Sequence, residues 1–179
     1  MTILQIKRGD FAKVIGMNPL RVDKANERDL FPFSKGPGKK TYSLEEAVSA
    51  HLMFKLIGEE SEAGHPSSGL SPSHAKWIMQ TAMASIARTR SKTGEYFPLG
   101  SEGYLDGKDR WIGISAKEKV ESSAVLLTVL PIYGTMTELA AWIDARSPTR
   151  VLMVNATRGL RFVMGRLTEI GLIANDSVD

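Results

Sequence analysis

Two clusters of basic side chains stand out in the first third of the chain. The first cluster, on Arg21, Lys24 and Arg28, falls within eight residues and directly follows Asn18 and Pro19. A guanidinium fork can bind the O6 and N7 atoms of guanine, a pairing that contributes about 1–3 kcal/mol of discrimination, and Lys and Arg both neutralise phosphates. Arg21 is therefore the first candidate for a base contact, whereas Lys24 and Arg28 also suit phosphates.

The second cluster surrounds a Gly-Pro-Gly sequence. Lys35, Lys39 and Lys40 lie at this tip, and extended residues on both sides predict a β-hairpin over residues 30–42. Lysines at such a tip suit contacts with the backbone or minor groove of DNA, and we include Tyr42, at the end of the hairpin, among the candidate contacts. The alternative is that these lysines only keep an edge strand soluble.

Local signals predict the helices that position both clusters. Residues 8–15 carry apolar side chains at helical spacing and are followed by Gly16, which suits a tight turn. Asn18 is a typical N-cap, and Pro19 fits the first helical position because its missing N–H costs nothing there, so a second helix is expected to begin at Pro19. Asn18 is also a candidate for DNA contact because it lies at the start of this helix.

A third helix is predicted from Ser43 to Ile57. Ser43 and Glu46 have the spacing of a capping box, and apolar residues follow at helical intervals. Residues 1–57 contain ten basic and six acidic side chains, a net charge of +4, whereas the whole chain carries +3. Charge and motif order therefore agree in this segment, although an excess of this size is also common on a solvated surface.

The order of these elements resembles the N-terminal winged helix-turn-helix domain of the MerR superfamily of regulators. The resemblance covers residues 10–18, the apolar pair Leu30-Phe31 and residues 40–46. It implies that the second helix enters the major groove and that the hairpin is the wing. The usual Thr-Leu-Arg-Tyr-Tyr-Glu sequence of the second helix is replaced by residues 21–26, and Asp23 stands where an arginine commonly contacts the DNA backbone.

Beyond this unit we expect a linker and connecting helix over residues 58–109 and a small C-terminal α/β domain over residues 110–179, which gives an α+β fold class. A helix is predicted at residues 72–88, and a turn-rich, irregular stretch follows to residue 109. Strands are predicted at residues 110–115, 124–132 and 151–155, a helix capped by Thr135 ends near Ser147, and a last helix spans residues 159–170. Such a domain suits homodimerisation or the sensing of a small-molecule or protein effector. Its last helix carries Arg158, Arg161 and Arg166, which could pair with an anionic ligand or a partner. The alternative, which amphipathicity alone favours, is a solvated helix face opposite the apolar stripe.

Enzyme chemistry is not supported by the motifs present. The three histidines, His51, His65 and His74, lack the spacing of a zinc protease, and the chain has no cysteine, which excludes disulfides and thiolate metal sites. No phosphate-binding loop ending in Lys-Ser/Thr and no Gly-x-Ser-x-Gly elbow occurs. We expect no catalysis, no metal and no cofactor.

The leading hypothesis is a cytoplasmic transcriptional regulator that binds double-stranded DNA sequence-specifically as a homodimer. No apolar run is long enough to span a membrane, and no secretory signal is visible. One alternative is an architectural, DNA-bending factor similar to an excisionase. Another is a protein-interaction module in which the winged unit does not bind DNA.

Overall fold

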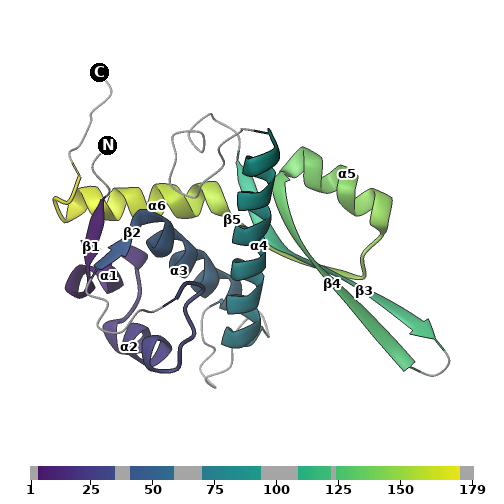
Figure 1. Ribbon diagram of the computed structural model, residues 1–179, viewed down its shortest axis with the longest axis horizontal. Coiled ribbons are helices and arrows are strands. Elements are labelled where there is room, and N and C mark those ends of the chain that lie inside the picture. The colour runs from purple at the N-terminus through teal and green to yellow at the C-terminus, as the bar shows by residue number, and fades with distance from the viewer. Residues whose placement is uncertain (1–3, 35–40, 59–69, 94–108, 122–123, 174–179) are drawn as a thin grey trace.

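The computed structural model describes residues 4–34, 41–58, 70–93, 109–121 and 124–173, and these residues form an α+β fold (Figure 1). The predicted fold class is therefore confirmed. In chain order the elements are β1 (Gln5–Lys7), α1 (Arg8–Ile15), α2 (Pro19–Glu27), β2 (Thr41–Ser43), α3 (Leu44–Ile57), α4 (Pro72–Thr93), β3 (Arg110–Glu121), β4 (Ala124–Thr135), α5 (Met136–Arg146), β5 (Arg150–Asn155) and α6 (Ala156–Glu169).

The turn between α1 and α2 forms as its residues predict. Gly16 adopts a left-handed conformation with φ of 70°, and its N–H donates to the Lys13 carbonyl. The Asn18 side chain accepts a hydrogen bond from the Leu20 N–H at 2.9 Å, and Pro19 is the first residue of α2. A glycine is favoured at the turn because a Cβ is strained at this φ.

Capping boxes start both α3 and α5. The Ser43 hydroxyl accepts from the Glu46 N–H at 3.1 Å, and the Glu46 carboxylate accepts from the Ser43 N–H at 2.9 Å. Thr135 and Glu138 make the same reciprocal pair before α5. Both helix starts were correctly predicted, because the capping box lies within four consecutive residues.

The strand pairing predicted for residues 30–42 is wrong. β2 pairs in antiparallel fashion with β1, with Ile6 opposite Tyr42, whereas residues 30–34 form no strand. Pro32 has no N–H to donate to a ladder, and the neighbouring rings of Phe31 and Phe33 stack on each other with centroids 5.2 Å apart. Aromatic packing, and not strand pairing, therefore determines the path of the chain here. The predicted hairpin tip at residues 35–40 lies outside the described residues.

The C-terminal sheet has the order β4-β3-β5, and both pairings are antiparallel. β3 and β4 pair over 12 residues each, from Arg110 opposite Thr135 to Glu121 opposite Ala124, so both strands continue beyond their predicted ends. β5 pairs only with residues 111–116 of β3, and the far part of the β3–β4 hairpin projects away from the helices (Figure 1). The observed order, in which α5, β5 and α6 follow the β3–β4 hairpin, is the order of the predicted strands and helices.

The boundaries of two helices also differ from the predictions. α4 continues to Thr93, five residues past its predicted end, and α6 begins at Ala156, three residues before the predicted start. The Asn155 side chain caps α6 by accepting from the Arg158 N–H at 2.8 Å. Pro148 precedes β5 in the connection after α5, as predicted, and Ser147 is the left-handed C-cap residue of α5.

One buried core runs through the described part of the molecule, with α3 at its centre. Every α3 residue from Ala47 to Phe54 is buried, and α3 contacts α1, α4, α6 and β5. The cluster also includes Phe11 of α1, Met79 of α4 and Ile112 of β3. Residues from all three predicted segments therefore contribute to the same core, and α6 packs directly on α1 and α3 (Figure 1).

Among the described residues, no helix has both the length and the hydropathy that a bilayer-spanning segment requires.

Candidate nucleic-acid interface

Helix α2 divides into a buried and an exposed side. Val22, Ala25 and Asn26 of α2 are buried. The exposed side consists of Leu20, Asp23, Lys24 and Glu27 with the C-cap residue Arg28, and we call these five residues the α2 surface. The α2 surface therefore contains two of the predicted DNA contacts, Lys24 and Arg28, beside an exposed leucine.

Asn18 lies at the start of this surface, where its side chain is exposed and its Oδ1 atom caps α2. The cap is structurally important because it satisfies an amide that has no partner within the helix. Asn18 is thus located where the prediction expected it, with its carbonyl oxygen engaged by the Leu20 N–H.

Arg21, the first candidate for a base contact, is directed towards α3. Its guanidinium carbon lies 5.4 Å from the centroid of the Phe54 ring, a cation–π arrangement, and the residue is partly buried. Helical periodicity alone did not reveal this orientation, because Phe54 is 33 positions later in the chain. Arg21 would have to leave Phe54 in order to reach a base.

Tyr42 is a core residue, so its prediction as a DNA contact is wrong for this structure. Only 3% of the residue is exposed, and its ring stacks on Phe11 with centroids 3.9 Å apart and an interplanar angle of 21°. Burial raises the pKa of the Tyr42 hydroxyl above its ordinary value. The predicted contacts Lys35, Lys39 and Lys40 lie outside the described residues.

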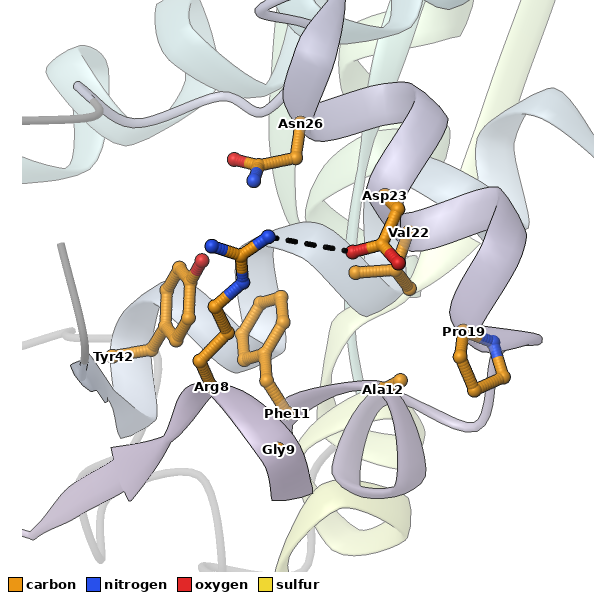
Figure 2. Close-up of a pocket in the computed structure, with 9 residues that line it drawn as sticks. All are labelled: Arg8, Gly9, Phe11, Ala12, Pro19, Val22, Asp23, Asn26 and Tyr42. Carbon is orange, nitrogen blue, oxygen red and sulfur yellow. Dashed lines mark ion pairs between the residues drawn. The ribbon is translucent and has the colours of Figure 1, made fainter. Parts of the chain in front are cut away.

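A residue that the sequence did not single out, Arg8, borders the α2 surface. A hollow of about 370 Å³ lies between the start of α1, α2 and β2. Figure 2 shows the Arg8 side chain extending from the first residue of α1 into this hollow, beside the Tyr42 ring and towards Asp23. The Arg8 Nη2 and Asp23 Oδ1 atoms are 3.7 Å apart, and the two side chains are 62% and 53% exposed. No local pattern links residues 8 and 23, so this pairing could be found only in the folded chain.

A second carboxylate next to α2 is also paired with a cation from another element. The Lys76 ammonium group of α4 lies 2.9 Å from the Asp29 carboxylate and also donates to the Asp29 backbone carbonyl. Asp23 and Asp29 are thus both neutralised by cations that belong to other helices. The pairing reduces the negative charge that α2 and its C-terminal end present to an approaching anion.

Among the described residues there is no group of three or more His, Asp or Glu side chains that is placed to hold a metal ion. Comparison with models of known protein families, and with the sequences of curated proteins, finds no match to this chain.

Proposed function

We propose that this protein is a sequence-specific DNA-binding regulator that places α2 in the major groove. The observation that carries the proposal is the division of α2. One side packs onto α1 and places Arg21 beside Phe54 of α3, while the other side, the α2 surface, faces solvent next to a glycine turn. In helix-turn-helix proteins the second helix reads the major groove with its N-terminal residues while the first helix crosses the backbone. The order of α1, the glycine turn, α2 and α3, which resembles the MerR arrangement apart from the hairpin, supports the same assignment.

Three residues of the α2 surface, Leu20, Lys24 and Arg28, have a chemical role in this proposal. Lys24 and Arg28 bind phosphates or base edges. Leu20, which is 70% exposed in the first turn of α2, is suited to contact the methyl group of thymine. Arg8 adds a phosphate contact when it leaves Asp23. The Arg8–Asp23 ion pair lies on the surface, and such a pair contributes at most about 1 kcal/mol to stability.

The proposal includes a homodimer and a cytoplasmic location. A single helix-turn-helix unit reads few base pairs, and helix-turn-helix dimers bind two half-sites one helical turn apart. Sedimentation of the free protein and of its DNA complex tests the dimer directly. A single bound copy per DNA site would overturn this part of the proposal without affecting the α2 assignment.

The test is a fluorescence-anisotropy titration of the full chain against labelled DNA from upstream of its own gene and against a shuffled fragment of equal length. We expect a preference for the native fragment and a steep salt dependence, because each phosphate contact releases counterions. The variants Lys24→Ala and Arg28→Ala should each lower the slope of log K against log salt by about 1. Arg150→Ala, at an exposed position of β5, is the matched control and should leave binding unchanged.

Two outcomes would contradict the proposal. Equal affinity for both fragments would leave only sequence-independent backbone contacts, as in an architectural factor. No binding at low salt would exclude DNA as the partner and favour the protein-interaction module.

A further inference from the structure

A groove that borders the turn between α1 and α2 joins the first and last thirds of the chain. It lies between α3, α6 and strands β3 and β5, and its volume is about 450 Å³. Binding sites for small molecules usually fall between about 300 and 1,000 Å³. The side chains that matter for its chemistry are His51 and Lys55 of α3, Trp111 of β3, Met153 of β5, and Arg158 and Phe162 of α6.

The aromatic wall of the groove is held in place by several contacts. The rings of His51 and Phe162 stack with centroids 4.5 Å apart and an interplanar angle of 16°. His51 Nδ1–H donates to the Ile15 carbonyl at 2.9 Å, which fixes the imidazole ring. A Cβ on Gly16 would lie 2.6 Å from the Phe162 ring, so this ring packs closely over the turn before α2. The wall is therefore preformed in the absence of a ligand.

The interior of the groove is largely uncharged. Burial lowers the pKa of His51 below its ordinary value of 6.5, so the imidazole is neutral at pH 7. Trp111, Met153 and Phe162 supply flat or flexible apolar surface. These side chains favour a ligand with a planar, apolar body.

The rim of the groove carries positive charge. Lys55 and Arg158 line it, and Arg161 lies one helical turn from Arg158. The one carboxylate in direct contact with these arginines among the described residues is that of Asp109, at 3.4 Å from Arg158 and 3.7 Å from Arg161. Asp109 also accepts a hydrogen bond from the Asn155 amide at 2.8 Å, so it is held against the start of α6. Three cations against one anion leave a net charge of +2 at the rim.

We propose that this groove binds a small aromatic carboxylate, with its ring against Phe162 and Trp111 and its carboxylate between Lys55 and Arg158. An apolar body suits the interior, and an anionic group complements the rim, where hydrogen bonds to charged donors are stronger than neutral ones. The inference does not depend on DNA binding, since it concerns the ligand alone. It names a chemical class for the effector that the C-terminal half was expected to sense.

Isothermal titration calorimetry of the full chain tests the site with 2-naphthoate as the probe and with the uncharged 2-naphthalenemethanol as its matched analogue. We expect saturable binding of 2-naphthoate with a Kd in the millimolar range or tighter, and weaker binding of the alcohol. Lys55→Gln and Arg158→Gln should each weaken 2-naphthoate binding by about threefold to tenfold, because each removes a charge-assisted hydrogen bond. Both side chains are exposed, so neither substitution should disturb the fold.

Asp109→Asn should change the affinity for 2-naphthoate in the opposite direction. It removes the only carboxylate in contact with the rim arginines among the described residues, and it should tighten 2-naphthoate binding severalfold. Arg150→Gln is again the control and should change nothing. Three results would each overturn the proposal. They are the absence of saturable binding, equal affinity for the acid and the alcohol, and an affinity for 2-naphthoate that none of the three rim substitutions changes.

Discussion

Replacing Gly159 with alanine adds a methyl group where α6 packs closely against α3. A Cβ at this position would lie 2.5 Å from Leu52 Cδ2 and 3.3 Å from Leu52 Cγ. Favourable contacts between carbon atoms lie near about 3.5–4.0 Å, so the overlap with Cδ2 is roughly 1 Å. Leu52 is only 1% exposed and cannot swing into solvent to relieve it.

Gly165 in the same helix is the matched control, because a Cβ there meets no atom within 4 Å. Alanine is more favourable than glycine inside a helix by about 0.8–1.0 kcal/mol, so both substitutions have the same local gain. Overpacking a core costs about 1–3 kcal/mol, and only Gly159→Ala incurs this cost. We therefore expect Gly159→Ala to lower the free energy of unfolding by about 1 kcal/mol and Gly165→Ala to raise it by a similar amount.

Urea unfolding followed by far-UV circular dichroism measures this difference of about 2 kcal/mol, which corresponds to roughly 4–8 °C in Tm for a chain of this size. Leu52→Val removes the clashing Cδ2 atom, so it should cost less in the Gly159→Ala background than in the wild type, a coupling that a double-mutant cycle isolates. If Gly159→Ala is as stable as Gly165→Ala, the close approach of α3 and α6 is not as described and the reasoning fails.

Three further predictions concern charge, protonation and capping. Asp23→Asn removes a negative charge from the α2 surface, so DNA affinity should rise by about threefold to tenfold in anisotropy titrations at low salt. The control substitution Asp144→Asn, on α5, should have no effect. Unchanged affinity for Asp23→Asn would argue against α2 as the interface. Because His51 has a lowered pKa in the folded state, the unfolded chain binds more protons just below pH 6.5, so Tm should fall as the pH is lowered through this window. His51→Gln should reduce that fall, and equal slopes in the wild type and in His51→Gln would contradict the burial of His51. Ser43→Ala removes the side-chain half of a capping box, so it should lower the free energy of unfolding in urea by about 1 kcal/mol. A loss near zero would exclude the described cap.

The features that sequence reasoning predicted correctly depend on a few neighbouring residues. Asn18 with Pro19, Ser43 with Glu46, and Thr135 with Glu138 each place a cap and its partner within one helical turn. The required hydrogen bonds are local, so the residue types alone indicate where the helices begin. The α+β class follows from the same signals together with the apolar periodicity of the strands.

The features that were missed depend on contacts between distant residues. The partner strand of β2 lies 36 residues earlier, at Ile6 opposite Tyr42, and no turn between them specifies that pairing. Arg21 has the chemistry of a base-reading residue, but its orientation is determined by Phe54. His51 belongs to no motif in the sequence. Its structural contacts, a hydrogen bond to Ile15 and a stacked ring of Phe162, form only in the folded chain. The sequence therefore indicated residue types and helix starts, but not the direction in which these side chains point.

The single core shared by α3 and α6 also has a consequence for how the protein is made. During synthesis, α3 leaves the ribosome about a hundred residues before α6, and α1 leaves earlier still. Until α6 emerges, the α3 side chains that it covers lack their partner. Exposed apolar surface of this kind promotes aggregation and recruits chaperones. We expect a ribosome-bound chain that ends at β5 to be sensitive to protease in α3, and a chain that includes α6 to be resistant. The packing of α1 and α3 would then be completed only after the last helix has been translated.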